Sequence, residues 1–197
     1  MKELLLPVSL FALSMCATPG PNNMMLTASG ANFGFRRTIP HILGIEFGLL
    51  FMFVLNAAGL GLAFKTFPIL QSILKIVSVG YLFYLAIRIA FSKPVNISTN
   101  TQAKPLSFLE AAAFQLVNPK VLMMALTAMS TFSIAGNHYS LSVSLIIAIF
   151  GLVCIPSISL WAGFGVLIGR MLKGRKSHTA FNLLMSGLTA GSVLLIV

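Results

Sequence analysis

Two groups of polar residues interrupt apolar stretches at matching places in the two halves of the sequence. The first is T-P-G-P-N-N at 18–23, and the second is Q-L-V-N-P-K at 115–120. Proline removes a backbone donor and clashes with the preceding helical turn, so both groups predict broken helices. Lipid cannot satisfy the carbonyl groups that such a break leaves without donors. Paired breaks, one in each half, are typical of the substrate site of a secondary transporter.

The side chains at the two breaks suit a zwitterionic ligand. Amides supply both hydrogen-bond donors and acceptors, and a lysine ammonium can bind a carboxylate. The asparagines could instead cap the backbone freed by the breaks, and the two roles can coexist. We predict that the substrate-binding residues are Pro19, Gly20, Pro21, Asn22, Asn23, Gln115, Asn118, Pro119 and Lys120.

Two further charged residues lie inside apolar stretches, where charge is costly and often functional. Glu46 points about 200° away from the Gly44/Gly48 seam of its own helix, so it can face a second neighbour or a cavity. We predict that Glu46 and Lys75 take part in coupling transport to protons. Glu46 could instead be a structural partner of Lys75 or of a helix dipole, and Lys75 could extend to the interface. Glu110 is expected to cap its helix.

Composition places the chain among polytopic membrane proteins. Of 197 residues, 57% are hydrophobic and 8% are charged, with a mean hydropathy of +0.97, against about 25% charge in soluble domains. The net charge of +10 is scattered between apolar stretches, which argues against a nucleic-acid partner. The histidines show no metal-ligand spacing, and Cys16 and Cys154 are expected to be buried hydrophobes. We expect no metal site and no cofactor.

The expected fold is all-α, one transporter domain over 1–197 with six transmembrane helices, the first helix of each half being broken. Two halves, 1–91 and 107–197, are joined by a polar linker at 92–106. Pro156 is expected to kink the fifth span. By length and apolarity the spans are 4–29, 39–64, 67–91, 107–135, 141–169 and 178–197.

Basic residues predict the orientation. Nine lie in or beside the odd-numbered connections: Arg36, Arg37, Arg88, Lys93, Lys104, Arg170, Lys173, Arg175 and Lys176. The opposite side has two, Lys2 and Lys65. The odd connections are therefore expected in the cytoplasm and both termini outside it. With three spans per half, the second half then runs opposite to the first, as two inverted three-helix repeats.

Small residues recur at helix-packing spacing. The G-x-x-x-G pattern occurs at Gly44/Gly48, Gly165/Gly169 and Gly187/Gly191. Such glycines let helices approach closely in lipid, either within one chain or across a dimer. The pattern leaves both alternatives open, so a homodimer is one expected assembly.

Several of these motifs together resemble the LysE/RhtB superfamily of bacterial amino-acid exporters. The resemblance rests on 18–23, on G-F-R-R at 34–37, on G-I-E-F-G at 44–48, on 74–82 and on 115–120. Segments 102–108 and 127–132 look closest to its cysteine/O-acetylserine exporter branch. The resemblance implies a multi-pass protein of the bacterial inner membrane that uses the proton gradient. Glu46 departs from the family pattern, so its coupling role is not implied by the resemblance.

The residues and the resemblance together predict a secondary transporter that exports small neutral amino acids or related metabolites, by proton antiport. Its expected partners are the amino acid, protons and membrane lipid. The rival readings are a channel-like pore, a subunit of a membrane complex and, less favoured, an intramembrane enzyme. A serine protease would need a histidine at the depth of Ser29, and a redox enzyme would need paired cysteines.

Overall fold

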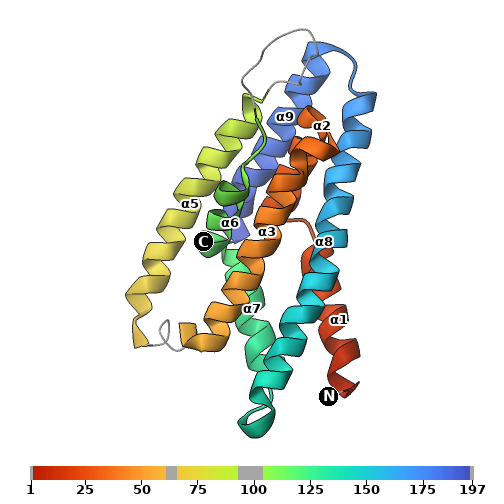
Figure 1. Ribbon diagram of the computed structural model, residues 1–197. Coiled ribbons are helices and arrows are strands. Elements are labelled where there is room, and N and C mark those ends of the chain that lie inside the picture. Colours follow the sequence, from red (N-terminus) through yellow and green to blue (C-terminus); the bar gives the residue numbers. More distant parts are fainter. Residues whose placement is uncertain (1, 61–65, 93–103, 196–197) are drawn as a thin grey trace.

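The described residues fold almost wholly into helices that run roughly along one axis (Figure 1). The computed structural model describes residues 2–60, 66–92 and 104–195. Lys65, Lys93, Val197 and most of the 92–106 linker therefore lie outside the described residues. The elements are α1 (Lys2–Ala17), α2 (Pro21–Phe33), α3 (Phe35–Leu55), the π-helical turn η1 (Asn56–Leu60), α5 (Pro68–Ala90), α6 (Phe108–Val117), α7 (Pro119–Phe132), the 3-10 turn η2 (Gly136–His138), α8 (Tyr139–Met171), α9 (Gly174–Gly191) and the 3-10 turn η3 (Ser192–Leu195).

Both predicted breaks are present. The axes of α1 and α2 differ by 55°, and those of α6 and α7 by 63°. Each second helix restarts on a proline, Pro21 or Pro119, at the first helical position. Proline is tolerated there because that N–H has no intrahelical partner in any residue. Pro156 is different, since α8 continues through it as one helix.

The number of membrane spans is settled only in part. In the described ranges, three helical stretches are long and apolar enough to cross a bilayer alone: Phe35–Leu60, Ser72–Ala90 and Gly136–Met171. Counting each bent pair as one span raises the number to five. Described residues of the sixth expected span, 178–197, belong to α9 and η3, and α9 begins with Arg175 and Lys176. The sixth span stays a prediction.

Successive spans alternate in direction (Figure 1). α1 and α2 ascend from the N-terminus in this view, whereas α6 and α7 descend, so the two broken helices run in opposite senses. The α2–α3 turn, the end of α5 and the α8–α9 turn all lie at the upper end. These segments carry Arg36, Arg37, Arg88, Arg170, Lys173, Arg175 and Lys176. The opposite courses agree with an inverted arrangement, and a repeat symmetry stays a prediction.

Glycines allow the closest helix contacts. A Cβ on Gly165 of α8 would lie 2.1 Å from the Thr27 carbonyl oxygen of α2. A Cβ on Gly44 of α3 would lie 2.3 Å from the Phe108 carbonyl oxygen of α6. Two of the three G-x-x-x-G pairs therefore pack helices of one chain together. Gly187 has nothing within 4 Å of such a Cβ among the described residues, so the third pair is open.

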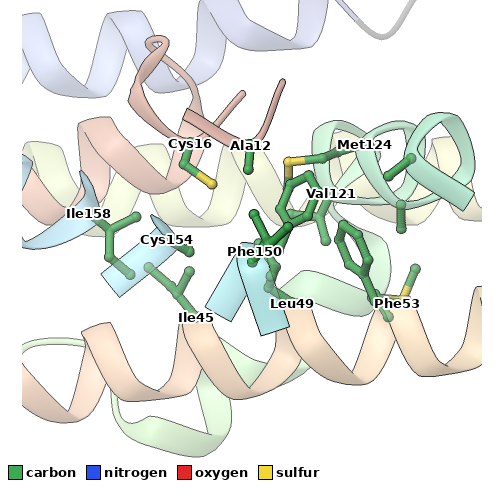
Figure 2. Packing of buried hydrophobic residues seen from close by; sticks show 14 of the residues in the cluster. Ala12, Cys16, Ile45, Leu49, Phe53, Val121, Met124, Phe150, Cys154 and Ile158 are labelled. Carbon is green, nitrogen blue, oxygen red and sulfur yellow. The ribbon is translucent and has the colours of Figure 1, made fainter. Parts of the chain in front are cut away.

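The main hydrophobic core lies among α1, α3, α7 and α8 (Figure 2). Phe53 and Phe150 form its centre, with ring centroids 4.4 Å apart. Cys16 and Cys154 belong to the same cluster and are free thiols, as expected for buried small hydrophobes. This core lies directly beside the two breaks and fixes their relative position.

Candidate functional site

The two helix breaks contact each other through Lys120. Its Nζ donates to the Thr18 carbonyl oxygen at 2.8 Å and lies 3.0 Å from Thr18 Oγ1 and 3.4 Å from the Pro19 carbonyl oxygen. All three acceptors belong to the non-helical residues between α1 and α2. The predicted site residues of the two halves are therefore brought together.

A cluster of amides forms the second contact between the breaks. Asn22 Nδ2 donates to Gln115 Oε1 at 2.8 Å, and Gln115 Nε2 donates back to Asn22 Oδ1 at 3.2 Å. Asn118 Nδ2 also donates to Gln115 Oε1, at 3.3 Å. Asn118 additionally caps α7, since its Oδ1 accepts from the Lys120 backbone N–H. The amides thus hold α2, α6 and α7 in one arrangement.

The carbonyl groups freed by the first break find donors within the protein. Asn23 Nδ2 donates to the carbonyl oxygens of Cys16 (3.1 Å) and Thr18 (2.8 Å). Trp161 Nε1 donates to that of Ala17 at 3.2 Å. At the second break, the Ser78 hydroxyl donates to the Val117 carbonyl oxygen. The backbone-capping role weighed for the asparagines is confirmed for Asn23 and Asn118.

Trp161 and Ser78 were not identified from the sequence. Neither lies in a motif next to a break, and each reaches it from a different helix, α8 and α5. The only available signal was polarity inside an apolar stretch, which many residues of this chain share. Their contribution depends on tertiary packing.

Two adjoining hollows surround the contact between the breaks. The larger has a volume of about 330 Å³ and the smaller about 30 Å³. Both are lined by Met15, Gly20, Pro21 and Lys120. Asn22, Asn23 and Asn118 line the smaller one, and Thr18, Pro19 and Pro119 the larger. The volume of the larger hollow falls within the range of about 300–1,000 Å³ that is usual for small-molecule sites.

The electrostatics of this region favour an anion. In the part of the chain that the structure describes, the Lys120 ammonium has carbonyl and hydroxyl partners but no carboxylate partner. Gly20, which precedes α2, gives the helix no side-chain cap, and such an N-terminus carries partial positive charge. Gly20 makes room for the lysine, because a Cβ there would lie 3.0 Å from Lys120 Cδ and 3.1 Å from Nζ.

Glu46 lies beside this region on the opposite face of α3 from the glycine seam. Gly44 and Gly48 pack on α6, whereas Glu46 Oε1 approaches Gly151 of α8, as the helical geometry predicted. Glu46 is 7% exposed, and neither carboxylate oxygen has a hydrogen-bond partner among the described residues. The Cys154 thiol lies next to it and lines the smaller hollow.

Lys75 is placed elsewhere. Its side chain is exposed on α5, and it lines neither hollow at the breaks. The pairing of Glu46 with Lys75, which the sequence left open, is not formed. Glu110 does cap α6 as expected, in a reciprocal capping box with Ser107.

Comparison with known proteins identifies the family. A family model described as LysE type translocator matches residues 13–197, nearly the whole chain. The chain belongs to the LysE-type translocator family. This confirms the resemblance noted from the motifs, and it confirms a transporter in place of an enzyme. No solved structure matches the chain.

Two relatives of this LysE-type translocator are described as efflux proteins for the same pair of compounds. The cysteine/O-acetylserine efflux protein of Escherichia coli (strain K12) is 31% identical over 184 residues, which cover 89% of this chain and 90% of the relative. The protein of the same description from Salmonella typhimurium (strain LT2) is 31% identical over 186 residues, with the same coverage. The family and the apolar helices together identify a membrane transporter.

Proposed function

We propose that this translocator exports a small neutral amino acid or a related metabolite, with cysteine and O-acetylserine as the first candidates, and binds it where the two breaks meet. The observation that carries the proposal is the Lys120 ammonium, which has oxygen partners from the first break but no carboxylate partner among the described residues. The carboxylate of an amino acid supplies the missing charge. The efflux descriptions of the relatives support the direction of transport and the candidate substrates.

Both ends of a zwitterion find partners in this arrangement. The carboxylate would bind Lys120 Nζ and the backbone N–H groups at the start of α2. The ammonium would bind the carbonyl oxygens of Thr18 and Pro19, which the lysine then releases. Asn22, Gln115 and Asn118 would position these groups through the amide cluster, and Asn23 would do so through the Cys16 and Thr18 carbonyl groups that it holds. Pro19, Gly20, Pro21 and Pro119 would shape the backbone.

The same proposal includes the orientation of the helix bundle in the membrane. The basic end of the bundle would face the cytoplasm, and both termini would lie outside it. The chain would then be a six-span protein of a bacterial inner membrane, with two inverted halves that rock against each other. Alternating access would expose the breaks first to one side and then to the other.

We further propose that protons drive export through Glu46. Its carboxylate is buried inside the span Phe35–Leu60, next to the Cys154 thiol. Cys154 connects its position to the smaller hollow. A proton taken up from outside in one conformation and released to the cytoplasm in the other would couple the gradient to export. The exposed position of Lys75 leaves Glu46 as the residue we assign to this step.

Counterflow in proteoliposomes tests the proposal. Vesicles preloaded with unlabelled O-acetylserine should accumulate external radiolabelled O-acetylserine transiently and saturably, which a pore cannot do. Cysteines placed at Pro21 and Pro119, in a background without Cys16 and Cys154, should be labelled by a small thiol reagent, and O-acetylserine should protect them. Absence of counterflow with any small neutral amino acid, or labelling unaffected by a transported substrate, would contradict the function or the site respectively.

A further inference from the structure

A third hollow, lined mostly by apolar side chains but with several polar ones, lies at the basic end of the bundle, away from the helix breaks. Its volume is about 40 Å³, and its lining includes Ser29, His41, Arg88, Ser92, Lys104 and Leu106. It shares no lining residue with the two hollows at the breaks. The residues come from α2, α3, the end of α5 and the two ends of the linker, so this hollow lies where the first half meets the linker.

His41 is the most unusual residue of this hollow. It is 1% exposed, and neither Nδ1 nor Nε2 has a hydrogen-bond partner among the described residues. Buried polar side chains nearly always have partners, because an unpaired donor or acceptor costs free energy. Its neighbour Ser29 is already hydrogen-bonded to Thr38. His41 lines the hollow, and its imidazole carries an N–H that no described residue accepts.

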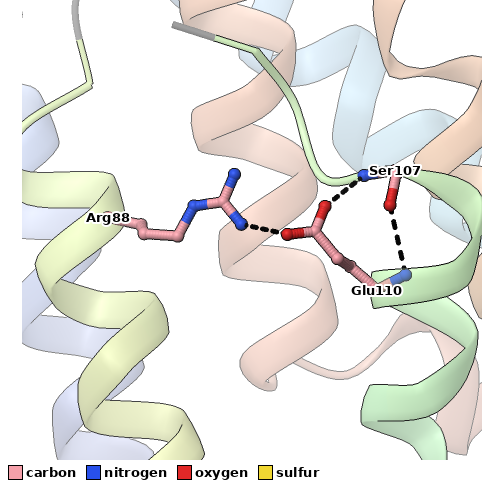
Figure 3. Close-up of polar contacts among 3 residues, drawn as sticks. All are labelled: Arg88, Ser107 and Glu110. Atoms are coloured by element: carbon pink, nitrogen blue, oxygen red, sulfur yellow. Dashed lines mark hydrogen bonds and ion pairs between the residues drawn. The ribbon is translucent and has the colours of Figure 1, made fainter.

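Arg88 adds a cation, whose guanidinium contacts Glu110 and lies over the Tyr84 ring, 5.8 Å from its centroid. Its Nη1 lies 2.6 Å from Glu110 Oε1, and the other Glu110 oxygen accepts the Ser107 backbone N–H at 2.8 Å (Figure 3). The second terminal nitrogen of the Arg88 guanidinium points away from Glu110 (Figure 3). A guanidinium has five donors, so the second terminal nitrogen can take a ligand carboxylate first, and the contact with Glu110 is the one that then gives way. Lys104, whose side chain is exposed, adds positive charge at the rim.

We propose that the hollow lined by His41, Arg88, Ser29 and Lys104 is a second binding site, which takes the carboxylate group of the transported amino acid before it reaches the helix breaks. The site rests on the proposed function, and it is called the loading site below. Its volume corresponds to about three water molecules, enough for a carboxylate but not for a whole amino acid. The ammonium end would extend past Arg88 towards the Glu110 carboxylate.

The loading site has a structural consequence. The Arg88–Glu110 ion pair joins α5 of the first half to α6 of the second half. A zwitterion at this place offers a carboxylate to Arg88 and an ammonium to Glu110, so it competes with the ion pair itself. Occupation of the loading site would therefore loosen a contact between the halves, which rocking of the halves requires.

Transport measured separately from the two faces tests the loading site. Half-saturation concentrations for O-acetylserine are determined in everted vesicles and in right-side-out vesicles. His41→Phe keeps the ring volume and removes the donor, and Arg88→Gln removes the charge. Each should raise the half-saturation concentration about tenfold on the face that carries the loading site and leave the value on the other face unchanged.

Two further variants serve as controls. His41→Gln, which retains an N–H donor, should bring the half-saturation concentration most of the way back to that of the unmodified protein. The matched control is Arg170→Gln, an exposed arginine at the same end that does not line the hollow.

Every outcome decides the proposal. A rise on both faces alike, or on neither, would overturn the loading site. Failure of the unmodified protein to transport saturably would instead overturn the proposed function. Where a His41 variant does not fold, Ser92→Cys in a background without Cys16 and Cys154 replaces it. O-acetylserine should slow its labelling by a thiol reagent even when Lys120→Met disables the break site, and unaltered labelling would overturn the loading site.

Discussion

The side-chain amides of Asn22 and Gln115 are hydrogen-bonded to each other in both directions, across 93 residues of sequence. One amide lies in the first turn of the helix after the first break, and the other lies one turn before the second break. Such a reciprocal pair fixes the two helices more narrowly than one hydrogen bond can. The position of Lys120 against the first break depends on how the amide pair aligns these helices. Lys120 is therefore the first residue at which we test the site.

Replacing Lys120 should impair binding of the substrate carboxylate. Lys120→Met keeps the length of the side chain and removes the charge that contacts Thr18 and Pro19. A hydrogen bond to a charged group is worth about 1.5–3 kcal/mol, so the half-saturation concentration should rise about tenfold or more on both faces. The measurement is initial-rate transport of O-acetylserine in proteoliposomes, with elution on size exclusion as the folding check.

The control for Lys120 is Lys173→Met, which removes a lysine that is exposed near the α8–α9 turn. It should transport like the unmodified protein. Transport by Lys120→Met at unchanged half-saturation concentration would show that the ammonium only holds the break together. A variant that fails to fold would assign Lys120 the same structural role.

Gly20→Ala should act through Lys120. The backbone at Gly20 is extended, with φ −174°, a conformation that any residue adopts. The added Cβ would instead lie 3.0 Å from Lys120 Cδ and 3.1 Å from Nζ, so the lysine has to shift by a few tenths of an ångström, which lengthens its contacts with the first break. We expect transport to fall several-fold with little change in thermal stability, as measured by tryptophan fluorescence. If Gly20→Ala transports normally, the observed lysine position is not required for binding.

The sequence predicted the breaks, the capping by Glu110 and the direction in which Glu46 faces, because each follows from local rules. Proline chemistry fixes Pro21 and Pro119, the position of Glu110 in the first turn of its helix favours capping, and helical periodicity places Glu46 opposite Gly44. Trp161 could not be assigned in this way, because nothing local shows that its ring nitrogen reaches Ala17 from another helix. The exposed position of Lys75 could not be assigned either, since its depth in a span does not tell which face of α5 it occupies, and its role in coupling stays a prediction.

Glycine contacts between α2 and α8 should be essential for folding. A Cβ on Gly165 would lie 2.1 Å from the Thr27 carbonyl oxygen, which is backbone and cannot rotate away. Gly165→Ala should therefore destabilise the protein by about 1–3 kcal/mol, as overpacking does. Gly163→Ala, two residues away on α8, meets nothing within 4 Å among the described residues and serves as the control. Equal melting temperatures for the two variants would contradict the close approach of α2 and α8.

The proposed orientation predicts the activity of reporter fusions. Fusions at Asn137, in η2, and at Val197 should be active with alkaline phosphatase and dark with a cytoplasmic fluorescent protein. A fusion at Lys173 should behave in the opposite way, because the α8–α9 turn carries Lys173, Arg175 and Arg170. A fluorescent fusion at Val197 would overturn the sixth span and the inverted arrangement together. A phosphatase-active fusion at Lys173 would overturn the assignment of the basic end to the cytoplasm.

Glu46→Gln separates proton coupling from substrate binding. The amide keeps the shape of a side chain that packs against Gly151 and Cys154, but it cannot take up and release a proton. Export driven by a pH gradient should therefore fall strongly. Exchange of O-acetylserine at equal pH on both sides should persist, because in exchange the transporter returns with substrate bound and needs no net proton movement.

The control is Cys154→Ser, which changes the neighbouring thiol and leaves the carboxylate, and it should retain gradient-driven export. Loss of export and exchange together in a folded Glu46→Gln protein would assign Glu46 to substrate binding, and full activity in both assays would remove it from the mechanism.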